Sequence, residues 1–372
     1  LLRAYNDIDH IAPIIWKSAT AGWHVFFVFV DKDYSEDYRI KFVAAQGARQ
    51  IRSGVIEWYH DRLRHFLAPR ALKRICDRVV AYLFGSFLLI RNNIDVIANE
   101  WSGPFGRERA EYYLRAGALL GLSVYSLPHG YMIFMNPFFN KEVTEIYEKR
   151  GEFPDFSNRS WFTKYVVQSR EQKKASIDYG MNANKLVVLG SARFCKEWSA
   201  INYDLLCGTS ELSRKELFTI LFFLPHWDYN VHRNKCISLL EKISSLNNVH
   251  LDIKAHTRGS GALDLREKEK LGSRPNVTIP DEAIHSTLLV NSADVVVNFG
   301  SSVAFEAMRQ GKPVINPMYL HDNRTFFDHS GAVIDTIDEE STLNCIVELQ
   351  SGRGSAPGQL QIDDFLLYRV YG

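Results

Sequence analysis

Cysteine and long apolar runs are both scarce in this sequence. The five cysteines are scattered, with no CxxC pair and no spacing typical of a metal site. Because their number is odd, a complete disulfide framework is excluded and a reducing compartment is expected. The best membrane-spanning candidate, residues 79–90, contains Gly85 and Ser86 and is too short to cross a bilayer. No signal peptide is recognisable. We therefore expect a cytoplasmic protein.

An excess of charge of one sign is also lacking. The 44 Lys and Arg residues nearly balance the 43 Asp and Glu residues, so the formal net charge is +1. This balance argues against nucleic-acid binding, which needs a basic excess. What is present is a globular composition, with 46% hydrophobic and 23% charged residues. The 372 residues are enough for two domains of ordinary size.

Expected strands and helices alternate along the whole chain. The main expected strands are residues 24–30, 94–99, 123–127, 165–168, 185–189, 217–224, 249–255, 277–279 and 293–297. Such alternation is typical of parallel sheets covered by helices. A polar stretch at 207–214 divides the pattern. We predict an α/β protein with two Rossmann-like domains, 1–205 and 215–350, whose parallel sheets face a central cleft. The remainder, 351–372, is predicted to be a tail that packs back on the first domain.

The most informative stretch follows the strand at 293–297. The strand ends at Gly300, after which Ser301 and Ser302 open an amphipathic helix. A helix N-terminus carries unpaired N–H groups and a partial positive charge, so it binds phosphate well, and two hydroxyls add donors. Glu306 lies one turn further on, where a carboxylate would bind a ribose diol. The alternative interpretation is that the serines only cap a helix.

Other polar residues follow the strands of the second half. Lys254, His256 and Arg258 would suit a phosphate or a sugar carboxylate, unless they form a solvated basic loop. Asp228 is a candidate nucleophile, general base or sugar ligand, unless it caps a helix. Ligands in such sheets bind beyond the carboxyl ends of the strands, which favours a function for all of them. Further residues expected to line the cleft are Asn298, Asn323 and Arg324, the last as a partner for a donor carboxylate.

In the first half, His129 and Gly130 follow the strand at 123–127. His129 would contact the donor sugar or assist proton transfer. Gly130 would permit close backbone approach or a positive φ angle.

These motifs resemble those of a known enzyme class. His256 with Ser301 and Ser302 resembles the paired His and Ser-Ser motifs of bacterial CMP-sugar transferases, although Thr257 stands where a proline is usual. His129-Gly130 resembles the His-Gly element of surface-polysaccharide transferases, including those that use CDP-glycerol. The chain as a whole looks like a GT-B glycosyltransferase of bacterial surface-polysaccharide assembly, and most like the β-Kdo transferases that use CMP-β-Kdo.

The resemblance implies a site in the second domain and a reaction. CMP would bind with its phosphate at Ser301, Ser302 and His256, its cytosine near Ile279 and its ribose near Glu306. Kdo would pass to a bacterial surface glycan of O-antigen or capsule type. Configuration would be retained through a covalent intermediate on Asp228. No cofactor and no metal are expected.

The resemblance also assigns the acceptor to the first domain. Acidic residues there are candidates for the acceptor's base or its ligands: Asp7, Asp9 and Glu100. Helix capping is the stronger alternative for the two aspartates, so Glu100 is the preferred base. A lipid-linked acceptor would bring the protein to the inner face of the cytoplasmic membrane as a peripheral protein. The chain could also be one module of a larger polypeptide.

Four alternatives remain open. The first two are a CDP-glycerol-type phosphotransferase, with His129 as the base and Lys254 and Arg258 on the pyrophosphate, and a transferase for another CMP-sugar, such as a sialyl-like one. The third is a sugar-nucleotide 2-epimerase, which shares the fold and needs no acceptor. The fourth is a non-catalytic glycan-binding protein that kept the fold.

Overall fold

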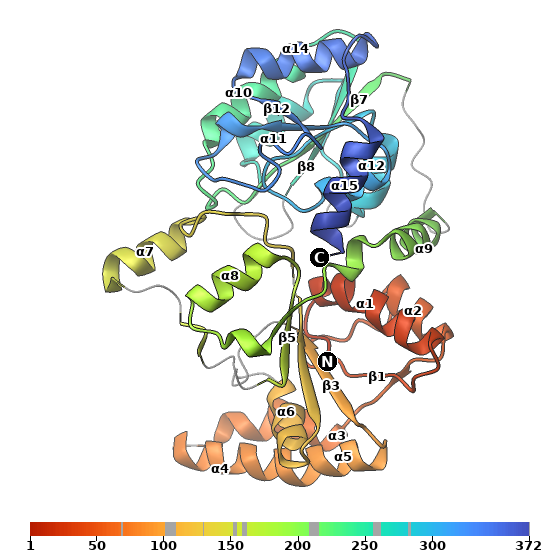
Figure 1. Cartoon of the computed structure of the whole chain (residues 1–372), viewed down its shortest axis with the longest axis vertical. Helices are drawn as coiled ribbons and strands as arrows, with labels where there is room; N and C mark the ends of the chain where they lie inside the picture. Colours follow the sequence, from red (N-terminus) through yellow and green to blue (C-terminus); the bar gives the residue numbers. More distant parts are fainter. Residues whose placement is uncertain are drawn as a thin grey trace. The chain divides into compact units, whose positions relative to one another are not determined.

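The computed structural model describes most of the chain and divides it into two compact units (Figure 1). The described residues are 1–67, 70–100, 109–128, 130–151, 155–157, 162–207, 216–255, 262–281 and 284–371, with only the backbone of Asn6. Three predicted site residues, His129, His256 and Arg258, lie outside them. Unit 1 comprises Leu1–Tyr131, Asp155–Trp198 and Val370–Gly372, and unit 2 comprises Met132–Pro154 and Ser199–Arg369.

Unit 1 contains short parallel strands and the helices that cover them. Its strands are β1 (Phe26–Phe27), β2 (Arg49–Gln50), β3 (Val96–Glu100), β4 (Ser123–Leu127), β5 (Lys164–Val167) and β6 (Leu186–Val188). Its helices are α1 (Tyr5–Thr20), α2 (Tyr38–Ala45), α3 (Gly54–Trp58), α4 (Arg70–Val80), α5 (Ser86–Arg91), α6 (Ala110–Leu119) and α8 (Arg170–Asp178). Shorter turns are the π-helical η1 (Tyr59–Leu63) and η3 (Ala81–Gly85) and the 3-10 turns η2 (Arg64–Phe66), η5 (Ala183–Lys185) and η6 (Ala192–Phe194).

The strands of unit 1 follow a Rossmann order. β3, β4, β5 and β6 pair in parallel in that order, and β1 pairs with β2. Residues 1–3 join these two groups, since Leu2 bridges Phe29 in parallel and the Leu1 nitrogen donates to the Ala98 carbonyl at 2.7 Å. The strand order therefore reverses between residues 1–3 and β3, where ligands bind in such sheets.

Unit 2 holds a six-stranded parallel sheet in the order β12-β11-β10-β7-β8-β9. The strands are β7 (Phe218–Phe223), β8 (Val249–Lys254), β9 (Val277–Thr278), β10 (Val295–Val297), β11 (Val314–Pro317) and β12 (Ile334–Thr336). The helices are α7 (Lys141–Arg150), α10 (Arg233–Ile243), α11 (Leu265–Gly272), α12 (Ser286–Ser292), α13 (Ala304–Arg309) and α14 (Glu339–Gln350), with the 3-10 turn η8 (Met318–Leu320). Here the order reverses between β7 and β10.

Buried aliphatic and aromatic side chains of the strands form the core of unit 2. Ile220, Phe222 and Leu251 pack with side chains of α10, α11 and α14, such as Leu239 and Ile346, on one face of the sheet. Because both faces of a parallel sheet are covered, the central strands β7 and β10 are almost wholly apolar, which made them recognisable in the sequence.

Two helices continue across the division between the units. They are α9 (Lys196–Cys207) and α15 (Gln359–Val370). Within unit 2, Phe365 of α15 packs on Phe305 and Phe327, with ring centroids 6.2 and 5.7 Å away. Within unit 1, the Val370 carbonyl accepts a hydrogen bond from the Ser191 nitrogen at 2.6 Å. Most of the predicted tail is thus part of unit 2, and its last residues belong to unit 1.

Residues 132–154 also differ from the predicted boundaries, because they belong to unit 2 rather than to the N-terminal unit. Phe134 and Phe139 stack on each other, and both pack at a tilt against Tyr229, with centroids 5.3 to 6.0 Å apart. Phe134 also bridges Thr325 in an antiparallel pair. These contacts join the segment to the loops that follow β7 and β11.

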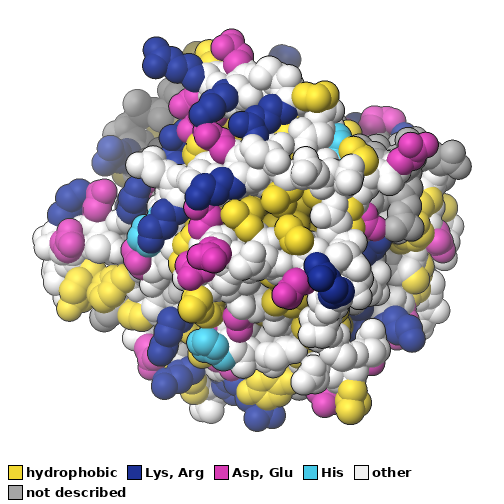
Figure 2. All heavy atoms as spheres, turned by 90° about the horizontal axis from the view of Figure 1, so that it is seen from above, with side chains coloured by type: hydrophobic (Ala, Val, Ile, Leu, Met, Phe, Trp, Pro, Cys, Tyr) yellow, Lys and Arg dark blue, Asp and Glu magenta, His cyan; other side chains and the backbone are white. Residues whose placement is uncertain are grey.

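The face of the molecule shown in Figure 2 carries Lys and Arg side chains interspersed with Asp and Glu side chains, as the near-neutral composition predicts. Among the described residues, no helix combines the length and the apolar character needed to cross a membrane.

Candidate functional site

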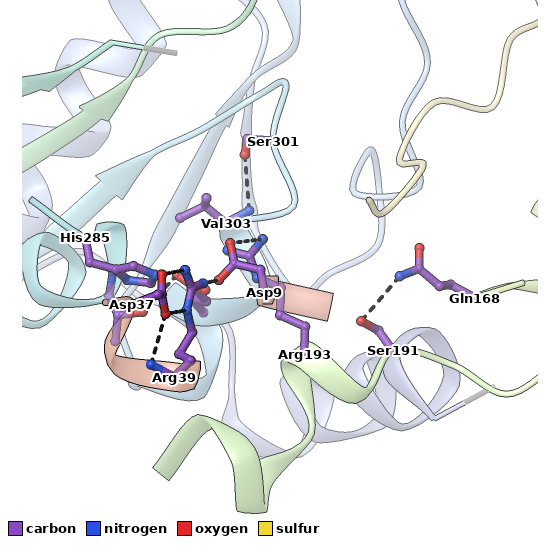
Figure 3. A network of polar contacts seen from close by, with 11 residues as sticks. Asp9, Asp37, Arg39, Gln168, Ser191, Arg193, His285, Ser301 and Val303 are labelled. Carbon is purple, nitrogen blue, oxygen red and sulfur yellow. Dashed lines mark hydrogen bonds and ion pairs between the residues drawn. The ribbon is translucent and has the colours of Figure 1, made fainter. Parts of the chain in front are cut away.

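The turn after β10 is built by its own polar side chains. Asn298 is buried, and its amide nitrogen donates to the Ser301 carbonyl at 2.7 Å. The Ser301 hydroxyl accepts from the Val303 nitrogen at 3.3 Å (Figure 3). Helix α13 begins at Ala304, three residues later than predicted. Ser301 thus shapes the turn but does not cap the helix, since the N-cap is Val303 and no side chain caps it. The half-buried Ser302 hydroxyl makes no hydrogen bond within the described residues.

Gly300 lets this turn approach the end of β7. A Cβ atom at Gly300 would lie 2.9 Å from the Cβ of Pro225. Real Cβ atoms do not approach each other so closely, so only glycine fits here. The turns after β7 and β10 are therefore packed together at the point where the strand order reverses.

His321, which the sequence-based prediction missed, stands beside the same turn. Its ring stacks on Phe299, with centroids 5.6 Å apart and planes 12° from parallel. Its Nδ1 accepts from the Asn323 nitrogen at 3.1 Å, so in the neutral imidazole the proton is on Nε2. Nε2 is buried and has no hydrogen-bond partner in the described part of the chain. Burial lowers the pKa of His321, which keeps the ring neutral. The sequence carries no strand-end signal for His321, because the 3-10 turn η8 separates it from β11.

Lys254 binds backbone carbonyls in this structure. Its side chain is buried, and its ammonium donates to the Asp281 and Ile284 carbonyls at 2.8 and 3.0 Å. It thereby holds these two residues between β9 and α12, and the half-buried Ile279 directly follows β9. Direct phosphate binding by Lys254 stays a prediction.

Glu306 is also buried. Its Oε2 accepts from the Thr287 hydroxyl at 3.3 Å, which joins α13 to α12. Ribose binding by Glu306 likewise stays a prediction.

Asp228 lies in the loop after β7 with its side chain 49% exposed. Its Oδ2 is 3.5 Å from Nδ1 of His226, and its carbonyl accepts from the Lys141 nitrogen at 2.9 Å. The next helix, α10, has His232 as its N-cap. Asp228 therefore does not cap that helix, and its carboxylate is accessible to a ligand.

Asn323 is a positioning residue rather than an available ligand. Its Oδ1 accepts from the amides of Asn136 and Asn230 at 3.0 and 2.9 Å, and its Nδ2 donates to the Phe139 and Tyr229 carbonyls at 3.0 and 2.7 Å. An amide has no further hydrogen-bonding capacity. Substrate binding by Asn323 stays a prediction, and in this structure its amide is committed to these four bonds. Arg324, in contrast, has an exposed side chain.

In unit 1 the two predicted aspartates are engaged, and Figure 3 shows the contacts of Asp9. Asp7 is fully buried and accepts from the backbone nitrogens of Arg3 and Ala4 at 2.8 and 3.0 Å, which fixes the start of α1. Asp9 is ion-paired with Arg39 and with Arg193, the latter at 3.3 Å. Asp7 thus follows the capping alternative, and Asp9 belongs to an ion-pair network instead.

Arg39, at the centre of that network, is a fully buried cation. Asp37 pairs with it at 2.7 Å, and the rings of Tyr5 and Tyr38 lie 4.4 and 5.1 Å from its guanidinium carbon. These partners raise the pKa of Arg39 although burial alone lowers it.

Glu100 ends β3 at the reversal of the strand order in unit 1. It is buried, and its Oε1 lies 2.7 Å from the Arg3 guanidinium. At the ends of β5 and β6, Gln168 donates to the Ser191 hydroxyl at 3.4 Å (Figure 3). A Cβ atom at Gly130 would meet no atom within 4 Å. The predicted role of Gly130 in allowing close backbone approach stays a prediction.

The comparisons with known proteins concern the fold. No protein-family model matches the sequence, and no curated protein matches it. A putative UDP-N-acetylglucosamine 2-epimerase from Listeria monocytogenes superposes with a TM-score of 0.59 at 11% identity, covering 100% of this chain and 91% of the other. A glycosyltransferase from Rickettsia africae gives 0.59 at 13% identity, covering 99% and 92%. An Anabaena protein in complex with UDP-glucose gives 0.56 at 13%, covering 96% and 91%.

Likenesses at this level of identity show the fold alone. The neighbours are GT-B fold proteins, and this chain has the same α/β architecture, with parallel sheets in two Rossmann-like halves. The predicted fold class is confirmed.

Proposed function

We propose that this chain is a glycosyltransferase whose nucleotide-sugar donor binds at the carboxyl edge of the unit 2 sheet. The observation that carries the proposal is a pair of hydrogen-bond donors beside the β10 turn that have no acceptor among the described residues. They are the Ser302 hydroxyl and Nε2–H of His321. Both lie where the strand order reverses. Donors held in place by a packed turn stabilise charge that develops on a departing nucleotide phosphate.

For the donor we propose CMP-β-Kdo, on the strength of the sequence resemblance. In the first step the Asp228 carboxylate attacks the anomeric carbon, and the bond to the CMP oxygen breaks with its electron pair on CMP. In the second step an acceptor hydroxyl displaces Asp228 and loses its proton to a base. Two displacements retain the configuration of the sugar. Glu100 is the proposed base, with His129 as the alternative.

A UDP-sugar is the second candidate donor. Among the structural neighbours, one is named as a UDP-N-acetylglucosamine 2-epimerase and another is in complex with UDP-glucose. These neighbours of the same fold are the observation that supports a uridine donor as the alternative. An epimerase would convert such a donor without any acceptor. A CDP-glycerol-type enzyme would instead leave phosphate in its product.

Nucleotide binding tests the proposal directly. We expect CMP to raise the melting temperature of the protein more than CDP or UDP, because a ligand at a hundred times its Kd adds about 2.7 kcal/mol of stability. Ser302→Ala should weaken this effect, whereas the exposed Ser355→Ala serves as the matched control. A larger rise in melting temperature with UDP would mean that the donor is a UDP-sugar. No response to any nucleotide would overturn the proposal.

Turnover tests the role of Asp228. We expect Asp228→Asn to lose Kdo transfer from CMP-Kdo by at least about a thousandfold, since the amide is no nucleophile. Stabilisation by CMP should persist, because the variant keeps the size of the side chain. Released CMP and transferred sugar are both measured. Near-wild-type turnover in this variant would remove Asp228 from the mechanism.

A further inference from the structure

A long helix of unit 1 leaves an apolar face uncovered. Helices α4 and α5 join through η3 into one continuous helix over residues 70–91. One side packs into the core of unit 1 through Val80, Ala81 and Leu89. Among the exposed large apolar side chains of this helix, six recur along another side, and they are Leu72, Ile75, Val79, Leu83, Phe87 and Ile90. Leu83, Phe87 and Ile90 are each more than 60% exposed.

These exposed side chains form a single stripe. They recur at intervals of three or four residues, which places them on one face of a helix. With a rise of 1.5 Å per residue, the 22 residues of this helix extend over about 33 Å. Isolated exposed apolar residues are ordinary, but a continuous stripe of this length marks an interaction site.

The preceding segment carries further exposed apolar side chains. Residues 54–67 form α3, η1 and η2, in which Trp58 and Phe66 are 53% and 84% exposed. Asp77 of α4 holds this segment, since it accepts from the Tyr59 hydroxyl at 2.9 Å and from Arg64 Nε at 3.0 Å. The two segments, 54–67 and 70–91, therefore form one ordered hairpin, which we call the hairpin surface.

Charge on the hairpin surface is strongly one-sided. Seven Lys and Arg residues stand against three Asp and Glu residues, which gives a net charge of +4. The rest of the chain carries −3, since the whole sums to +1. Arg74 and Arg78 are exposed on the same helix as the stripe. An apolar stripe flanked by cations matches an anionic lipid surface, whereas a second copy of the hairpin surface would bring +4 against +4.

We propose that the hairpin surface binds an anionic lipid bilayer as an interfacial element, with the helix of residues 70–91 in the plane of the membrane. Its apolar side chains insert at the boundary between headgroups and acyl chains, and its cations face the headgroups. The proposal does not rest on the proposed function, because it concerns unit 1 and involves no nucleotide.

Vesicle flotation with the full chain tests the proposal. We expect the protein to float with vesicles of equal parts phosphatidylglycerol and phosphatidylcholine and to stay behind with phosphatidylcholine alone. Salt should weaken the binding, because it screens the charges. Failure to float with the anionic vesicles, in protein that is folded by circular dichroism, would overturn the proposal.

Matched variants distinguish binding through the hairpin surface from nonspecific binding to vesicles. Leu83→Glu/Phe87→Glu and, separately, Arg74→Glu/Arg78→Glu should each lower binding at least about tenfold. The controls are Leu265→Glu, which removes a leucine that is 79% exposed in unit 2, and Arg266→Glu/Lys268→Glu on the exposed side of α11. Equal losses in the controls would contradict the proposal. So would a dimer, seen by sedimentation, that dissociates in Leu83→Glu/Phe87→Glu without any vesicle binding by the wild type.

Discussion

At the scale of single residues, the polar groups at the strand ends differ in how much hydrogen-bonding capacity they have left. Lys254 and Asn323 were predicted as ligands, but they donate to carbonyls of loops distant in sequence. The sequence shows that a polar residue follows a strand, but not which backbone groups will surround it. Ser302 was recognisable because it follows an apolar strand, whereas His321 lies beyond a 3-10 turn that carries no such signal.

His321 should make the protein acid-sensitive. Burial lowers its pKa below the ordinary 6.5, although nearby Asp328 and Asp322 oppose the shift. Below about pH 6.5 the unfolded chain therefore binds a proton that the folded chain does not, and stability falls as the pH drops. We expect His321→Gln to show a smaller fall in melting temperature between about pH 7 and pH 5 than the wild type.

The matched control for this experiment is His329→Gln, whose side chain in the wild type is 80% exposed. That variant should keep the acid sensitivity of the wild type. Equal slopes for the wild type and His321→Gln would show that His321 titrates alike in the folded and unfolded chains, and would contradict the assignment of a buried neutral imidazole.

At the scale of elements, the sequence predicts best where local pattern decides. The strand at 123–127 is observed as β4 over the same residues, and the expected strands at 217–224 and 249–255 are observed as β7 and β8 within one residue at each end. The strand at 217–224 is an apolar run, and the other two alternate apolar with polar residues, and each of these patterns is typical of a strand. The strand at 24–30 is reduced to the two residues of β1 and a single bridge at Phe29, because pairing depends on distant partners.

The hairpin surface shows the opposite case. In the sequence, its apolar residues at 79–90 indicated only a run too short to span a membrane. In the structure Gly85 lies against α6, where a Cβ would come within 2.9 Å of the Tyr112 carbonyl oxygen. The helix therefore packs closely on that side, and its other side is exposed to solvent. Pattern alone does not say which of two apolar faces is buried, because that depends on which neighbour is available.

At the scale of the whole molecule, the chain does not divide into two consecutive domains. It passes between the units after Tyr131, Pro154, Trp198 and Arg369. The sequence predicted two Rossmann-like halves, because each half repeats the alternation of strand and helix. It did not predict that residues 132–154 belong to unit 2, because aromatic contacts such as that of Phe139 with Tyr229 join residues far apart in sequence.

The contact of the last residues with unit 1 leads to a prediction. Gly190 has a φ angle of +74°, and a Cβ there would lie 1.9 Å from the Val370 carbonyl oxygen. Tyr371 makes a second contact, accepting from the Lys196 nitrogen at 3.1 Å. Gly190→Ala must therefore displace Val370 as well as strain the backbone. We expect the substitution to lower the free energy of unfolding by about 2 kcal/mol or more, beyond the loss that the positive φ angle alone causes.

Gly121→Ala is the matched control, because Gly121 also lies in unit 1 and has a φ angle of +69°, yet a Cβ there would meet no atom within 4 Å. It carries the backbone strain without the displacement. Melting followed by tryptophan fluorescence reports mainly on unit 1, since in the sequence Trp227 is the one tryptophan within the ranges of unit 2. Gly190→Ala should melt well below Gly121→Ala. Equal melting temperatures would mean that the contact between Val370 and Ser191 contributes nothing to the stability of unit 1.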